Sequence, residues 1–276
     1  MHNYEKPYYT IYQHFGCSGD IYVNDVIVTS RYGKKTEGAG GTIGAIPINQ
    51  AVLQSGTYEV VVKMFPRYGK DTLTREEYMM LDFDLAEADP DKWKKSQITF
   101  HPRIRQPWKG LSEGIRYPTF ALKTEIEIQL PYVLDGWQHS VNLADMDEEQ
   151  LFKEVYAYYL QLHGVVKSYN VAQFLAMGQE KMALQEQAFY FTEERKQSFR
   201  DGAASLFGQQ LELMPLQPEQ LRLQLMGHGR LATLIRRDEA HSCPIQFLSP
   251  HPEKQSNIEL EVKLHMRSKE KGFTII

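Results

Sequence analysis

The chain has 276 residues, of which 42% are hydrophobic and 24% are charged, and its formal net charge is −4. This composition is that of a globular protein, and the length exceeds that of most single domains, so we expect two domains. Both halves share the small negative charge without a basic stripe, which argues against nucleic acid as the main partner, and no apolar run is long enough to span a membrane.

The first part of the chain predicts short β-strands. An opening strand is expected over residues 8–15. Asn24-Asp25 separates two β-arms within residues 20–29, and this pair tolerates the positive φ angles of a two-residue hairpin turn. The glycine-rich stretch 38–44 is expected to be a loop. Residues 57–65 have two largely apolar faces, which is typical of a central strand.

Two further segments, residues 79–85 and 120–130, alternate apolar and polar residues and predict half-buried strands. The connection between them is rich in proline and tryptophan. We expect residues 89–114 to be a loop with one short strand near 97–100. The first domain, residues 1–144, is therefore expected to be an all-β sandwich, similar to a jelly roll.

Near Asp145 the apolar period changes from two residues to about 3.6, which indicates helices. Asp147 and the acidic residues after it predict a helix start, and Gly164 is expected to end this helix. Its buried stripe is expected to contain Leu151, Val155, Leu162 and either Tyr158 or Tyr159.

Two more helices are expected after the first. Ser168 is the predicted cap of a helix that runs through Met182. Thr192 is the predicted cap of the next one, which turns Phe199 inward and ends at Gly208.

Strands return in the last quarter of the chain. Residues 221–225 and 231–237 predict an antiparallel hairpin around Gly227-His228-Gly229. Residues 258–266 alternate over a longer strand, and residues 273–276 form a final one. Three helices followed by an antiparallel sheet predict an α+β domain over residues 145–276.

Three stretches contain residue types found in active or metal sites. Gly38–Gly44 lacks the order of a phosphate-binding loop, so we interpret it as a hairpin loop or bulge. The acidic run Asp82–Asp91 could offer oxygens to calcium, but its strand spacing is that of a solvated face. His241 and Cys243 lack further ligands or an activating base, so we interpret them as part of a loop that enters a strand. We predict no catalytic residue, no metal and no cofactor, and we expect Cys17 and Cys243 to be thiols.

Arginine and aromatic residues on loops are the types that anchor interfaces. They gather in the proline-rich connection, and a second group lies at the predicted turn of the last hairpin. The binding residues that we predict are Arg103, Arg105, Trp108, Arg116 and Tyr117 in the connection, with His228 and Arg230 at the turn.

Residues 20–26 with 48–56, residues 223–231 and the chain end 273–276 together resemble a family of uncharacterised two-domain bacterial proteins common in the Bacteroidetes. That resemblance implies a fold and no established activity. The order of elements over residues 147–276 resembles the cone-shaped fold of nuclear transport factor and ketosteroid isomerase relatives. Residues 48–56 with the following strand are similar to jelly-roll modules of carbohydrate-active enzymes, which often bind sugar or serve as scaffold.

The leading hypothesis is a non-enzymatic protein that binds a protein partner, as an immunity or accessory protein of an interbacterial toxin or secretion system. One alternative is carbohydrate or cell-envelope binding through the sandwich, with Trp93 or Trp108 as an aromatic platform. The other is a small-ligand or enzymatic pocket in the second domain. Residues 1–7 lack the apolar segment of a signal peptide, which favours the cytoplasm, whereas a removed signal would favour the periplasm or cell envelope.

Overall fold

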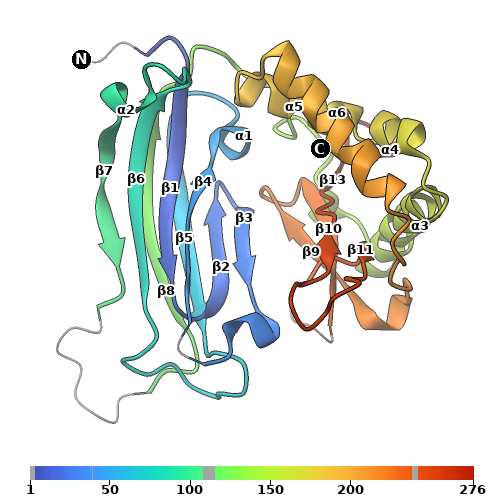
Figure 1. The fold of residues 1–276 in the computed structure, drawn as a ribbon, viewed down its shortest axis with the longest axis horizontal. Coiled ribbons are helices and arrows are strands. Elements are labelled where there is room, and N and C mark those ends of the chain that lie inside the picture. Colours follow the sequence, from blue (N-terminus) through green and yellow to red (C-terminus); the bar gives the residue numbers. More distant parts are fainter. Residues whose placement is uncertain (1–3, 39, 108–115, 238–241) are drawn as a thin grey trace. The chain divides into compact units, whose positions relative to one another are not determined.

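The computed structural model describes residues 4–38, 40–107, 116–237 and 242–276. The chain divides into two compact units, Met1–Leu134 and Asp135–Ile276. Figure 1 labels most of their helices and strands. The first unit contains two four-stranded antiparallel sheets, and the second contains helices α3–α6 with antiparallel sheets.

The second unit begins before residue 145, where we predicted the second domain to start. Backbone hydrogen bonds explain the difference. Val141 N donates to Met266 O at 2.8 Å, and Leu143 N donates to Gly229 O at 2.7 Å. Because Leu143 is also fully buried in the core of the second unit, the segment 135–144 packs with the sheet that follows it in the sequence.

The strands of the first unit form the sheets β4-β1-β6-β7 and β3-β2-β5-β8. The two sheets are in contact, since His101 Nε2 on β7 lies 2.8 Å from Thr124 Oγ1 on β8. The strands are β1 (Pro7–Phe15), β2 (Ser18–Val23), β3 (Val26–Arg31), β4 (Thr42–Pro47), β5 (Gly56–Phe65), β6 (Met79–Glu87), β7 (Ile98–Arg105) and β8 (Phe120–Ile128), with the short helices η1 (Gly33–Thr36), α1 (Asn49–Val52) and α2 (Trp93–Ser96) between them.

Alternation along each strand produces the core of this unit. Ile11 and Phe15 on β1, Phe83 on β6, and Val60 and Val62 on β5 are all fully buried. The residues directly next to each of them along the strand point to the opposite face, as the period of two in a β-strand requires. β5 lies between β2 and β8, so the prediction of a central strand is confirmed.

Strands that follow one another in the sequence are distributed over both sheets. Here β1 pairs with β4 and β6, and β8 lies in the other sheet beside β5. The hairpin turn at Asn24-Asp25 is confirmed, because both residues have positive φ angles of 54° and 59° and join β2 to β3.

One strand was missed and another is longer than predicted. The stretch 38–44 was expected to be a loop, but Thr42–Pro47 forms β4 against β1. The strand near residues 97–100 continues to Arg105, so Arg103 and Arg105 lie on a strand. Tertiary pairing overrides the weak strand propensity of glycine and proline at both places, and both strands are at sheet edges, where proline is tolerated.

The helices of the second unit begin with α3. Asp147 caps it as predicted, accepting a hydrogen bond from Gln150 N at 2.9 Å. Tyr159, and not Tyr158, is the fully buried tyrosine. The helices are α3 (Glu148–Lys167), α4 (Val171–Met177), α5 (Gln179–Ala188) and α6 (Glu193–Gly208), with the short turns η2 (Leu143–Asp145) and η3 (Pro218–Gln220).

Several helix boundaries differ from prediction. α3 runs past Gly164, and Asn170 rather than Ser168 caps the next helix, accepting from Gln173 N at 3.0 Å. That helix divides at Gly178 into α4 and α5, in keeping with the low helix propensity of glycine. The cap at Thr192 and the end at Gly208 are confirmed.

The exposed side of α6 also differs from prediction. Phe199 was expected to turn inward, but 42% of its surface is exposed. Phe207 is the buried phenylalanine of this helix, and its ring centroid lies 5.0 Å from that of Phe174.

The main sheet of the second unit has the strand order β14-β13-β10-β9. Its predicted hairpin, β9 with β10, is confirmed, but the expected strand 258–266 is divided between two sheets. The strands are β9 (Leu221–Met226), β10 (Leu231–Arg236), β11 (Gln246–Phe247), β12 (Ile258–Glu259), β13 (Leu264–Met266) and β14 (Phe273–Ile275).

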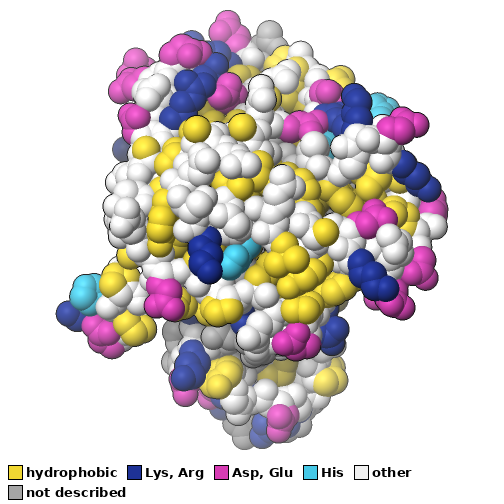
Figure 2. Space-filling model, turned by 90° about the vertical axis from the view of Figure 1, so that its right-hand side faces the viewer, with side chains coloured by type: hydrophobic (Ala, Val, Ile, Leu, Met, Phe, Trp, Pro, Cys, Tyr) yellow, Lys and Arg dark blue, Asp and Glu magenta, His cyan; other side chains and the backbone are white. Residues whose placement is uncertain are grey.

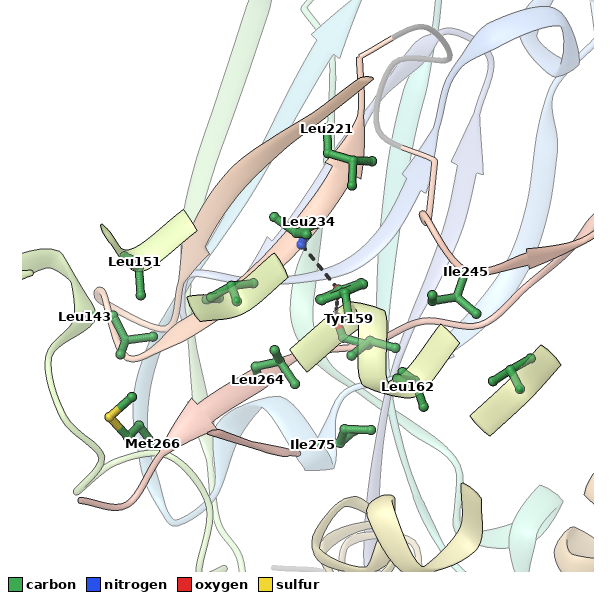
Figure 3. Close-up of a cluster of buried hydrophobic side chains, with 14 of the residues drawn as sticks. Leu143, Leu151, Tyr159, Leu162, Leu221, Leu234, Ile245, Leu264, Met266 and Ile275 are labelled. Atoms are coloured by element: carbon green, nitrogen blue, oxygen red, sulfur yellow. Dashed lines mark hydrogen bonds between the residues drawn. The ribbon is translucent and has the colours of Figure 1, made fainter. Parts of the chain in front are cut away.

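Tyr159 joins α3 to this sheet. Figure 3 shows its side chain among Leu234, Ile245 and Leu162, with a dashed line to the backbone of Leu234. Its hydroxyl accepts from Leu234 N at 3.2 Å and lies 3.0 Å from Val262 O. One polar group thus lies inside an apolar core with its hydrogen bonds made, as buried polar groups require.

Candidate functional site

The candidate site is the outer surface of the sheet β4-β1-β6-β7. Residues directly opposite each other in an antiparallel pair share one face of the sheet. One row across the strands therefore runs Ile43, His14, Met80, Arg105, and the next runs Ala45, Tyr12, Asp82. We define the outer surface as these seven residues with Arg103.

Apolar groups are exposed on this surface on the edge strand β4 and on β1 beside it. Ile43 on β4 is 61% exposed and Tyr12 on β1 is 37% exposed. The rings of Tyr12 and His14 meet edge to face, with centroids 5.2 Å apart. The inward residues of β1, Ile11 and Phe15, are fully buried, so Tyr12 and His14 must face outward.

Charged groups follow on the neighbouring strands. Arg103 on β7 donates from Nε to Asp82 Oδ1 on β6, and this hydrogen bond raises the pKa of the Arg103 guanidinium. Burial raises the pKa of Asp84, a hydrogen bond from Gln97 opposes the shift, and the nearby Asp82 carboxylate adds to it. The surface therefore combines an apolar edge with a polar band in which opposite charges are paired.

A further aromatic contact joins the strand of Tyr12 to the short helix α2. Tyr8 meets Trp93 of α2 edge to face, with ring centroids 5.0 Å apart. Trp93 is half-buried. The ring therefore packs partly against Tyr8 and keeps part of its surface exposed.

The predicted binding residues of the first unit lie on different elements. Arg103 and Arg105 lie on the outer surface. Tyr117 pairs through its backbone with Leu73, whose N donates to Tyr117 O at 2.7 Å, and Arg116 is exposed beside it. Trp108 lies outside the described residues.

The predicted pair in the second unit lies at the β9–β10 turn. His228 is exposed there with a φ angle of 55°, and Arg230 donates from Nε to Gln138 O at 3.2 Å. The main sheet is packed on a cluster of buried apolar side chains that includes Tyr159 and Phe247. Arg230 therefore helps to hold the segment 135–144 in place.

A second polar cluster, which the sequence did not suggest, lies in the second unit. Ser140 Oγ is 2.8 Å from His265 Nδ1, and His265 Nε2 is 3.1 Å from Glu180 Oε2. Glu180 also accepts from Thr274 Oγ1 and from Arg267 Nε, both at 2.6 Å. We call these five residues the buried network, and Arg267 also binds the exposed carboxylate of Asp135.

The buried network contains the order serine, histidine, carboxylate that activates nucleophiles in some hydrolases. Its surroundings favour a structural role. His265 has no exposed surface, Ser140 has 5%, and the Glu180 carboxylate is already bound by Arg267. Burial lowers the pKa of His265, the hydrogen bond to Glu180 opposes this shift, and the net direction favours the neutral ring. The neutral ring lies between the Ser140 hydroxyl at Nδ1 and the Glu180 carboxylate near Nε2.

Among the described residues, no three His, Cys, Asp or Glu side chains gather so that they could hold a metal ion. In the acidic run Asp82–Asp91, Asp82 is paired with Arg103. His241 lies outside the described residues, and Cys243 N donates to Glu259 Oε2 at 2.9 Å. Cys17 and Cys243 are free thiols, as expected.

Figure 2 shows one face, on which dark blue and magenta groups lie near one another in several places and much of the remaining surface is white or yellow. None of the helices in the described part of the chain combines the length and apolar character needed to cross a membrane.

No protein-family model matches this sequence, and comparison with the curated proteins and with the solved structures found no match either.

Proposed function

We propose that this protein is a non-enzymatic binding protein and that its outer surface holds a protein partner. The observation that carries the proposal is the exposure of Ile43 and Tyr12 beside the paired charges of Asp82 and Arg103. Tyrosine, methionine and arginine are enriched in interfaces, and an apolar centre with a polar rim is their common arrangement. We also propose that the two sheets of the first unit form a β-sandwich, which would give this surface a rigid support.

The biological setting that we propose is an interbacterial toxin or secretion system, in which the chain is an immunity or accessory protein. Paired charges around an apolar strip would favour a defined protein partner over a nonspecific polyanion. Co-production with the toxin of a neighbouring gene tests the setting. Survival with the native chain and death with an Ile43→Asp/Tyr12→Ala variant is the expected result, and equal survival would contradict it.

Photo-crosslinking tests the surface itself. A benzophenone amino acid at position 43 is compared in the source cell with the same group at position 125, an exposed position on β8. We expect one dominant crosslinked protein from position 43 and a much weaker one from position 125. Arg103→Ala should reduce the product at position 43. Equal labelling from both positions would remove the outer surface as the binding site.

A second candidate function is carbohydrate binding on the same surface. The pair of Tyr8 and Trp93, together with Tyr12, offers aromatic rings next to hydrogen-bonding groups, which is the composition of many small-ligand sites. A glycan array with the native protein and with Tyr12→Ala separates the two functions. Binding that Tyr12→Ala abolishes would favour sugar, and an array without signal from a folded sample would exclude it.

A further inference from the structure

The hydrogen bonds of β4 show which of its backbone groups face away from the sheet. Ile48 N donates to Tyr9 O at 3.1 Å, in the same register that places Pro47 opposite Thr10. In an antiparallel ladder, hydrogen-bonded pairs alternate with pairs that are not bonded to each other. Gly44 and Ile46 on β4 therefore bond to β1.

The groups that point away follow from the same alternation. Ile43 and Ala45 direct their N–H and C=O groups to the outer edge, and Pro47 adds one carbonyl there without a donor. The pairing of β1 with β6 on its other side agrees with this assignment. Ala88 N donates to Lys6 O at 2.8 Å, so in the same register every second residue of β1 from Lys6 onward, Tyr12 included, belongs to the pairs that bond with β6. In the described part of the first unit, β1 is the one strand that pairs with β4.

Natural sheets use charges, proline or bulges to keep such edges from pairing with another chain. β8 carries Lys123, Glu125 and Glu127, and the edge strand β7 carries Pro102 with irregular pairing to β6. β3 pairs with β2 through a shift in register. β4 ends in Pro47 but has no charged residue and keeps a regular register with β1, and it presents the exposed Ile43.

We propose that β4 is a docking edge and that the partner adds an extended, uncharged segment beside it as a fifth strand of the sheet. This inference rests on the proposed function and specifies how the partner binds. The segment would bond to the N–H groups of Ile43 and Ala45 and to the carbonyls of Ile43, Ala45 and Pro47, in the manner of β-strand addition. Side chains of the segment that face the outer surface would pack on Ile43, with His14 behind it.

The lack of charge on β4 determines the chemistry of the occupant. A charged side chain placed directly beside Ile43 would find no opposite charge on β4, whereas an apolar side chain would gain contact with Ile43. Threonine, valine and similar residues would make this contact and would adopt the extended backbone that pairing needs. The occupant is therefore a β-branched, uncharged segment.

Amide hydrogen exchange measured by NMR on the full chain tests this inference. The probe is the peptide acetyl-Thr-Val-Thr-Val-Thr-Val-amide, and the control is the same peptide with every backbone nitrogen methylated. In the free protein we expect fast exchange at Ile43 and Ala45 and slow exchange at Gly44 and Ile46. The probe should slow Ile43 and Ala45 about tenfold at nine-tenths occupancy, because exchange then proceeds from the free fraction. The control peptide should leave both rates unchanged.

Variants separate the possible outcomes. Ala45→Pro removes an outward N–H group without removing a bond to β1, and it should weaken binding of the probe while the circular dichroism spectrum stays native. An unchanged exchange rate at Ile43 and Ala45 with saturating probe would overturn strand addition, and crosslinking from position 43 would then still support protein binding. Slow exchange at Ile43 and Ala45 in the free protein, with sedimentation as a dimer, would also overturn the inference, because a second copy would then occupy the edge.

Discussion

His265 lies with its Nε2 atom 3.1 Å from Oε2 of Glu180, and the imidazole has no exposed surface. Protonation of this ring in the folded state is opposed by burial and by the nearby Arg267 guanidinium, whereas the Glu180 carboxylate and the more distant Asp135 favour it. The net result is a pKa below the ordinary value of 6.5.

The position of His265 predicts a loss of stability in mild acid. The unfolded chain gains a proton on this residue near pH 6.5, while the folded protein resists protonation until a lower pH. The stability that the folded protein gains from keeping His265 neutral is thus fully present above pH 6.5, and it declines as the pH falls below that value. Urea unfolding at several pH values between 8 and 5 should show a smaller decline for His265→Gln than for the native chain. His139→Gln, at an exposed position, is the control and should keep the native slope.

The position of Glu180 predicts a second loss of folding stability at lower pH. Burial raises its pKa, but hydrogen bonds from Thr274, His265 and Arg267 outweigh burial and lower the pKa from 4.5 to about 2. The stabilisation is therefore complete above pH 4.5 and disappears as the pH approaches 2. Because the carboxylate is partly solvated, we expect Glu180→Gln to cost about 1–2 kcal/mol at pH 7 and much less at pH 3. A cost that is the same at both values would contradict this account.

Tyr159→Phe should destabilise the second unit. The substitution removes the acceptor of Leu234 N inside the apolar core and leaves that donor without a partner. An unsatisfied buried donor costs about 1–3 kcal/mol. Tyr156→Phe is the matched control, because Tyr156 lies on the same helix and its hydroxyl bonds to Leu216 O from a partly buried position. Thermal unfolding should show a clearly larger decrease in Tm for Tyr159→Phe.

Gly19→Ala should destabilise the first unit. Gly19 has a φ angle of 154°, and a Cβ atom there would lie 2.0 Å from the backbone oxygen of Lys63 on the paired strand. Backbone atoms of a central strand cannot shift easily, so we expect a loss of about 2–4 kcal/mol. Gly40→Ala is the control, since a Cβ atom there meets no atom within 4 Å. Equal denaturation midpoints for the two variants would contradict the packing argument.

Regular periods in the sequence predicted most of the elements correctly. The hairpin at Asn24-Asp25, the central strand β5 and the caps at Asp147 and Thr192 each depend on a local rule of turn, burial or capping. β4 was missed because it begins inside the glycine-rich stretch 38–44, and pairing with β1 overrides the weak strand propensity there. Gly164 did not end its helix because packing of the α3 stripe on the sheet outweighs the cost of one glycine.

The candidate surface was only partly visible in the sequence. Arg103 and Arg105 were identified by residue type, but Tyr12, His14 and Ile43 depend on cross-strand pairs that bring distant segments together. The alternation of β1 could have indicated that Tyr12 and His14 share a face. The pairing of β1 with β4, and therefore the position of Ile43, follows from the fold and from no local pattern.

The strand order of the first unit also has a consequence for how this protein folds. Most consecutive strands of this unit lie in different sheets, so neither sheet forms from one continuous segment of the chain. Pairing such as β5 with β8 requires a long loop to close before any contact stabilises it, which is the property that slows the folding of β-rich proteins. Until the last pairs form, β1 and β5 each present an open apolar strand, and a nascent chain would need protection from aggregation during that interval.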